Sequence, residues 1–237
     1  MKLHNRLAVL ATLGLAASTG FAQDEEGFSG RAALGYLATS GNSDSDSLNA
    51  NFDLWWNYEP WSHSLAGRAI QSNTSGINTA KAYGLTWQSN YAVNETDYIF
   101  GLVAWDKDKF SAYDQQLREG IGYGRRFIDR ERHILNGQAG IGARQADLRN
   151  GMDQNEAIVL LGGDYRWIIS ETSEFSQTLS IESGSDNTYL EATSALSANV
   201  RDNLALVISY TLKNNSDVLP GTEKTDTFTA ISLEYAF

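Results

Sequence analysis

The sequence contains no cysteine, only 2 prolines in 237 residues, and no long apolar stretch beyond its first residues. Without cysteine no disulfide can hold the fold together, so backbone hydrogen bonds and packing must do so. Scarce proline is typical of long strands, in which each residue donates to a ladder of hydrogen bonds. No run approaches about eighteen consecutive apolar residues, so we expect no membrane-spanning helix.

Basic residues are also fewer than acidic ones, 18 against 29, which gives a formal net charge of −11. An acidic surface argues against nucleic-acid binding, which needs a basic face. Aromatic residues make up 11 % of the chain, and there are 21 glycines. This composition favours an all-β protein over a helical one.

The first 22 residues have the organisation of a secretory signal peptide. Lys2 and Arg6 precede an apolar run at residues 7–17, and Gly20-Phe21-Ala22 places small residues at a cleavage site. We expect residues 1–22 to be removed and residues 23–237 to form the mature domain. Loss of the two positive charges takes the net charge from −11 to −13.

Apolar and polar residues alternate along most of the mature chain, with the period of a strand. In "SLNANFDLWWNY", Leu48, Phe52 and Trp56 share one face, and Asn49 and Asp53 lie on the other. The pattern leaves the facing of the third, fourth and seventh strands open. We expect twelve strands, at residues 28–39, 46–58, 62–72, 79–92, 97–106, 115–128, 133–145, 155–169, 174–183, 188–200, 203–213 and 225–237.

The connectors between these strands alternate between tight turns such as "EPW" or "RDN" and longer polar segments such as "ADLRNGMDQN". Tight periplasmic turns and longer outer loops are typical of an outer-membrane barrel. A sheet enters hydrocarbon only when its two edges pair with each other. We therefore predict one closed antiparallel transmembrane β-barrel of about twelve strands in the outer membrane. A soluble sandwich or ligand-binding barrel shares the alternation but not the leader or the connectors.

The chain stops on an aromatic residue. Ile231, Leu233, Tyr235 and Phe237 lie on one face of the last strand. A terminal phenylalanine after outward apolar residues resembles the closing-strand signal of outer-membrane proteins, which implies recognition by the barrel-assembly machinery. Aromatic residues near the tight turns are expected to form an interfacial girdle against lipid: Tyr58, Trp61, Tyr91, Tyr98, Phe127, Trp167, Phe175 and Phe237.

The inward face is expected to carry charge. Arginines dominate the first eight strands and glutamates the last four, so a basic wall would face an acidic wall and orient solutes in a narrow pore. Alternatively, the charges pair across the lumen and plug it, since twelve strands lie between a filled barrel and an aqueous channel. The candidate pore-lining residues are Arg31, Asp53, Arg68, Arg118, Arg126, Arg144, Asp164, Arg166, Glu182, Glu191 and Glu234.

Catalytic and metal-binding patterns are poor. A lipid-facing phospholipase needs a histidine beside a serine, and His63 with Ser62 or Ser64 is the candidate, but adjacent strand residues point to opposite faces. We expect no enzyme and no cofactor. Asp44 and Asp46 have the oxygen chemistry of a calcium site, but a solvated turn is the expected reading, with no metal.

Two stretches, "LGYLATSGNSDSDSLN" and "VISYTLKNNSDVLPGTEKTDTFTAISLEYAF", resemble a domain-of-unknown-function family described as salt-induced outer-membrane proteins of Gram-negative bacteria. The resemblance implies an outer-membrane barrel linked to salt or osmotic conditions, and it brings no catalytic residues. The expected function is a narrow passive pore or a stress-associated envelope component. A plugged structural barrel is the alternative, followed by a phospholipase.

Overall fold

The computed structural model describes residues 27–39, 45–74, 77–109, 113–148, 151, 153–218 and 224–237. The predicted signal peptide and Asp44 lie outside these residues, so both expectations stay predictions. No helix long and apolar enough to cross a membrane occurs in the part of the chain that the structure describes.

All twelve predicted strands are present, each within three residues of its expected limits. They are β1 (Gly27–Thr39), β2 (Ser45–Tyr58), β3 (Trp61–Thr74), β4 (Ile77–Ala92), β5 (Asp97–Asp108), β6 (Tyr113–Arg130), β7 (His133–Leu148), β8 (Asp153–Ser170), β9 (Ser173–Ser183), β10 (Thr188–Arg201), β11 (Leu204–Asn215) and β12 (Thr225–Ala236).

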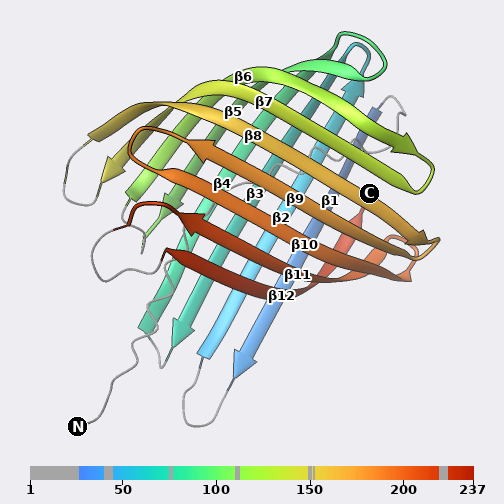
Figure 1. The fold of residues 1–237 in the computed structure, drawn as a ribbon. Helices are drawn as coiled ribbons and strands as arrows, with labels where there is room; N and C mark the ends of the chain where they lie inside the picture. Colours follow the sequence, from blue (N-terminus) through green and yellow to red (C-terminus); the bar gives the residue numbers. More distant parts are fainter. Residues whose placement is uncertain are drawn as a thin grey trace.

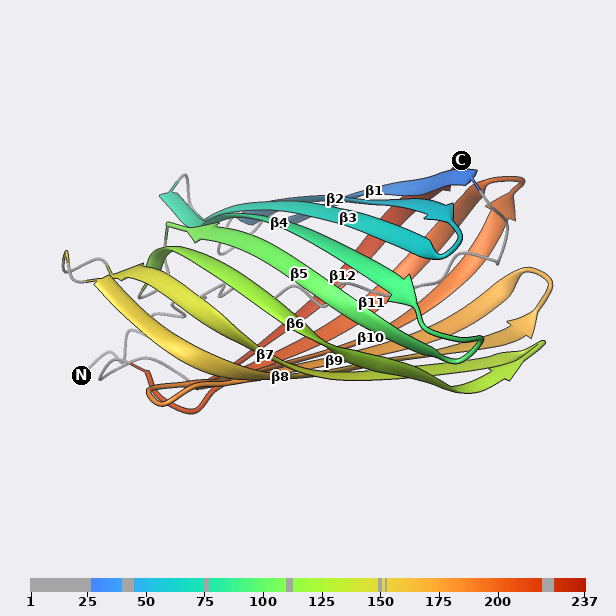
Figure 2. The same cartoon turned by 90° about the horizontal axis from the view of Figure 1, so that it is seen from above.

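The strands form a closed antiparallel barrel, as predicted (Figures 1 and 2). Each strand pairs with the next along the chain, and β12 returns to pair with β1, from Arg31 opposite Ala236 to Leu34 opposite Leu233. Closure joins the two edge strands through Arg31–Leu34 of β1 and Leu233–Ala236 of β12, and a sheet can enter hydrocarbon only when its edges pair in this way.

The connectors gather at two ends of the barrel (Figure 2). Residues 59–60, 93–96, 131–132, 171–172 and 202–203 turn at the end where the C-terminus lies, here called the tight-turn end. The other connectors lie at the long-connector end. The alternation in length is weaker than expected. Only residues 75–76 separate β3 from β4, where pairing continues past a register shift at Ser72 and Asn73, and the connectors at 109–112 and 149–152 are no longer than the turn at 93–96, because the strands extend into the predicted loops.

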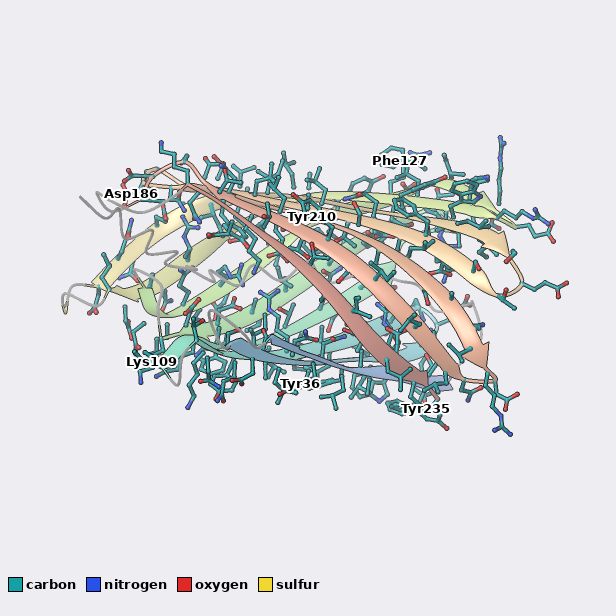
Figure 3. The ribbon with its side chains drawn as sticks, turned by 90° about the horizontal axis from the view of Figure 1, so that it is seen from below. Tyr36, Lys109, Phe127, Asp186, Tyr210 and Tyr235 are labelled. Carbon is teal, nitrogen blue, oxygen red and sulfur yellow. The ribbon has the colours of Figure 1, made fainter. Side chains whose placement is uncertain are left out.

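Large apolar side chains cover the outside of the barrel. Figure 3 shows Tyr36, Phe127 and Tyr235 at the outside of the barrel, and these three and Tyr210 are exposed. The third strand, whose facing the pattern left open, turns Trp61 outward and buries Ser64. The outer surface therefore has the composition of a lipid-facing face.

Tyr98 is the one wrong assignment in the expected girdle. Its side chain is 5 % exposed and donates a 3.4 Å hydrogen bond to Gln138. Gly124, on the neighbouring strand β6, leaves room for the ring inside the barrel, because a Cβ there would collide with it. Tyr98 faces inward with Phe100 and Asp106 of the same strand, and the glycine on β6 makes room for its ring.

Candidate functional site

Charged side chains contact one another across the lumen, nearer to the long-connector end. Arg68 on β3 lies 3.5 Å from Glu191 on β10, although these strands are not neighbours in the barrel. A contact between two such strands can pass only through the interior. Both side chains therefore face the lumen.

Arg118 on β6 stands at the centre of these contacts. One Nη atom donates to Glu182 on β9 and the other to Asp106 on β5. Asp106 also lies 3.5 Å from Arg68. Arg118 is only 4 % exposed, so its charge is balanced by two carboxylates rather than by water.

Two further cations extend the contacts. Arg144 donates to Glu156 and lies 3.9 Å from Glu182, and Lys213 lies 3.7 Å from Glu191. Four cationic and four acidic side chains thus contact one another in this part of the lumen, where Asp108 is also buried. We call them the cross-lumen network: Arg68, Asp106, Arg118, Arg144, Glu156, Glu182, Glu191 and Lys213.

A second cluster lies beside the seam between β1 and β12. The guanidinium of Arg31 is 2.9 Å from Asp53 on β2 and 3.8 Å from Glu234 on β12. It also lies over the ring of Trp55, 5.2 Å from the centroid, in the geometry of a cation–π contact. These contacts join the two strands of the seam, β1 and β12, to the neighbouring strand β2.

The three remaining candidate pore-lining residues, Arg126, Asp164 and Arg166, also have polar partners. Asn136 donates a 2.9 Å hydrogen bond to Asp164. Arg126 donates to Asp129 at 2.6 Å, and Arg166 lies 3.9 Å from Glu174. The function of the eleven residues as pore lining stays a prediction.

The charges do not form a basic wall opposite an acidic one. Asp106 on β5 pairs with Arg118 and Glu156 on β8 pairs with Arg144, so the arginine-rich strands carry acid as well. Sequence reasoning left out Asp106, Glu156 and Lys213. Strict alternation along each strand could have identified such inward-facing residues, since Lys213 lies on the same face as the polar Thr211 and Ser209.

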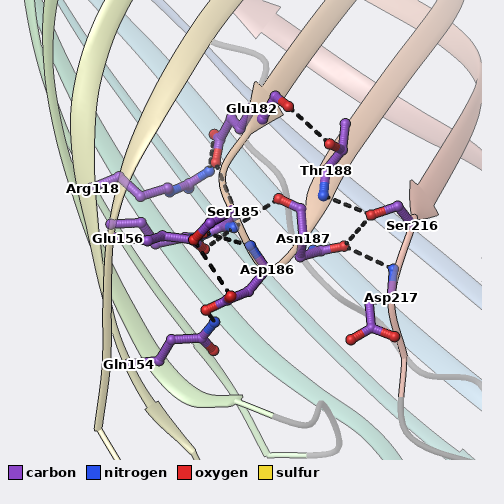
Figure 4. Close-up of polar contacts among 12 residues, drawn as sticks. Arg118, Gln154, Glu156, Glu182, Ser185, Asp186, Asn187, Thr188, Ser216 and Asp217 are labelled. Atoms are coloured by element: carbon purple, nitrogen blue, oxygen red, sulfur yellow. Dashed lines mark hydrogen bonds and ion pairs between the residues drawn. The ribbon is translucent and has the colours of Figure 1, made fainter.

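The connector at residues 184–187 is fixed to the barrel wall (Figure 4). The amide of Asp186 donates to Glu156 at 3.1 Å, and Arg144 donates to the carbonyl of Asn187 at 3.1 Å. The side chain of Asn187 donates to Asn215 at 2.8 Å and accepts from the amide of Asp217 at 3.1 Å. The connector therefore joins the cross-lumen network to the start of the β11–β12 connector.

Both described histidines lie on the outer face near the tight-turn end. His63 Nδ1 is 2.8 Å from the hydroxyl of Ser89, and its ring stacks on Trp61 with centroids 5.9 Å apart. The serine that meets His63 is thus on β4 and is neither Ser62 nor Ser64, because register, not sequence adjacency, decides the pairing.

This His–Ser pair lacks the rest of a hydrolase site. Among the described residues, no hydrogen bond joins His63 to a carboxylate or amide that would orient it. His133 has the same kind of surroundings, with Tyr165 at 2.8 Å and Trp167 stacked at 6.0 Å. Both histidines fit the aromatic girdle at the membrane surface.

The described residues contain no group of three or more histidine, cysteine, aspartate or glutamate side chains placed to hold a metal ion. Asp46 instead accepts a 2.8 Å hydrogen bond from Asn73. This contact fixes the start of β2 against the end of β3.

Residues 32–237 match the family model described as "Protein of unknown function, DUF481". The chain belongs to the DUF481 family. One relative is the uncharacterized protein YdiY of Escherichia coli K12, which is 28 % identical over 210 residues, covering 88 % of this chain and 83 % of YdiY. Membership agrees with the outer-membrane family that the sequence resembles.

Solved structures similar to this DUF481 chain are outer-membrane barrels. An outer membrane channel from Pseudomonas putida F1 has a TM-score of 0.56 at 10 % identity, covering 90 % of this chain and 95 % of the channel. The NanC porin has a TM-score of 0.52 at 8 % identity, covering 87 % and 97 %. The translocator domain of autotransporter NalP from Neisseria meningitidis has a TM-score of 0.53 at 11 % identity, covering 94 % and 92 %. At these identities the likeness establishes the fold.

Proposed function

We propose that this DUF481 protein is a narrow passive pore of the outer membrane in which the cross-lumen network forms the constriction. The location is supported by the fold, which it shares with an outer membrane channel and a porin. The link to salt or osmotic conditions rests on the family resemblance. Recognition of Ile231, Leu233, Tyr235 and Phe237 by the barrel-assembly machinery is also part of the proposal.

The observation that supports a pore is the charged interior. The free energy needed to remove two charges from water offsets much of the attraction between them. A well-packed apolar core of similar volume is therefore often at least as stable as a buried ion pair. A barrel with a purely structural function would gain little from four buried cations and four carboxylates. Such groups are the usual means by which a narrow lumen handles polar solutes.

A plugged structural barrel is the second candidate, and the same network favours it. The contacts of Arg118 join β5, β6 and β9, and that of Arg68 joins β3 and β10. These contacts span the lumen instead of lining it. The two candidates differ in whether loosening one contact opens a path for ions.

Replacing Arg118 with glutamine distinguishes them. The variant loses both ion pairs at the centre of the network, so a pore should give clearly larger single-channel currents in planar lipid bilayers for the variant than for the wild type. Arg201→Gln is the matched control, because the Arg201 side chain is 86 % exposed at the tight-turn end and should leave conductance unchanged. If wild type and Arg118→Gln are both silent at high protein load, the barrel does not conduct ions, which favours the plugged barrel.

A further inference from the structure

A small chamber lies inside the barrel on the tight-turn side of Arg118 and Glu182. It offers about 40 Å³ to the centres of water-sized molecules, and a water molecule needs about 10–15 Å³. Polar groups close its two ends, and apolar side chains form much of its wall. Its lining includes Thr86, Gln88, Phe100, Arg118, Gln138 and Glu182.

Three of the residues that line this chamber carry a buried polar atom without a partner in the described part of the chain. Thr86 Oγ1, Gln88 Oε1 and Arg118 Nε find no hydrogen-bond partner among the residues that the structure describes. The three side chains are 2 %, 1 % and 4 % exposed. Buried polar groups in folded proteins nearly always have a partner, and one that lacks it is strongly unfavourable.

The unpaired atoms are fixed by contacts that the rest of each side chain makes. The Gln88 amide nitrogen donates to Asn90 at 2.9 Å and to Gln138 at 3.2 Å, which leaves its carbonyl oxygen without a protein donor. Both Nη atoms of Arg118 are used by Glu182 and Asp106, which leaves Nε–H. The chamber thus presents an acceptor at Gln88, a donor at Arg118 and a hydroxyl of either kind at Thr86.

The fold keeps this space from collapsing. The ring of Phe100 lies against glycines of β6 and β7, where a Cβ at Gly122 would come within 2.6 Å of it and one at Gly140 within 3.0 Å. The two glycines thus leave room for this ring at the wall of the chamber.

We propose that the chamber is a binding site for small uncharged molecules that both donate and accept hydrogen bonds, water first among them, and that such molecules rather than ions pass through the barrel. The statement about passage rests on the proposed pore function. A guanidinium and a carboxylate, those of Arg118 and Glu182, both line the chamber, so an entering anion meets a carboxylate and an entering cation meets a guanidinium. An uncharged molecule that donates and accepts can pair with the unpaired atoms without that repulsion.

The binding site is tested by the sign of a stability change. Thr86→Val keeps the shape of the side chain and removes its hydroxyl. If the hydroxyl bonds to a bound molecule, the denaturant midpoint of the barrel in lipid vesicles should fall. If the hydroxyl has no partner, its removal should leave the midpoint unchanged or raise it, and this result would overturn the site. Thr229→Val, on the exposed outer face of β12, is the control and should not lower the midpoint.

Passage is tested with water as the probe. Proteoliposomes of the wild type should shrink faster than empty vesicles under a sucrose gradient, and Gln88→Leu should remove at least half of that protein-dependent rate while Thr229→Val retains it. Large ion currents from the wild type, or a water rate unaffected by Gln88→Leu, would overturn the selectivity and leave the pore standing. If the wild type passes no water and Arg118→Gln conducts no ions, the pore is rejected. The denaturant midpoint of Thr86→Val would still decide whether the chamber is a binding site.

Discussion

At the residue scale, the contact that closes the barrel joins the last residue to a glycine near its start. The backbones of Phe237 and Gly30 exchange two hydrogen bonds of 2.8 Å, and the Phe237 ring lies over Gly30. A Cβ at Gly30 would come within 2.8 Å of that ring. Alternation alone predicted that Phe237 faces outward. Its partner could not be predicted, because it depends on the register in which β12 meets β1.

Gly30→Val is therefore expected to weaken closure. The new side chain occupies the space of the Phe237 ring, and overpacking of this kind costs about 1–3 kcal/mol. The folded fraction in vesicles, measured by the heat-dependent shift in gel mobility, should fall. Gly101→Val is the matched control, since nothing lies within 4 Å of a Cβ there. Equal folded fractions for the two variants would contradict the assigned role of the ring.

At the scale of elements, the twelve strands and their order follow from the sequence, because period-two alternation indicates which side chains face lipid and which face the lumen. The register shifts, as at Arg126 and Ile128, and the fixed connector at residues 184–187 do not follow. The sequence gives no sign of the contacts that hold this connector. Its attachment depends on Glu156, Arg144 and Asn215, which lie on three other strands.

Asn187→Ala should release this connector. Its side chain makes hydrogen bonds to Asn215 and Asp217, and a net loss of about 1.4 kcal/mol corresponds to a tenfold change in an equilibrium. Because the chain has no cysteine, Ser185→Cys supplies a unique thiol. Labelling of this thiol should be about tenfold faster when Asn187→Ala is added. Asn94→Ala, in a turn at the opposite end, should leave the rate unchanged, and equal rates in all three backgrounds would show that Asn187 does not hold the connector.

At the scale of the whole molecule, the sequence indicated which side chains face inward but not which of them pair. Arg68 and Glu191 are 123 residues apart in the chain, and only closure of the cylinder brings them together. The predicted basic wall was wrong for the same reason. It did not include Asp106, whose carboxylate pairs with Arg118 in the closed barrel. Long-range charge pairing is thus a property of the closed barrel and cannot be read from any one strand.

The lipid-facing outer surface allows a prediction whose sign separates a membrane barrel from a water-soluble one. Ile141, in the middle of β7, is 66 % exposed. In water, lysine at such a site would be harmless or would improve solubility, whereas near the middle of a bilayer it costs about 2–4 kcal/mol on the lipid face of a barrel. Ile141→Lys should therefore lower the denaturant midpoint for folding into vesicles. Ile77→Lys is the control, because Ile77 is 70 % exposed but begins β4 at the long-connector end, where the headgroups and water reduce the cost to about 0–1 kcal/mol. If both lysines have the same small effect, acyl chains do not surround the middle of the barrel.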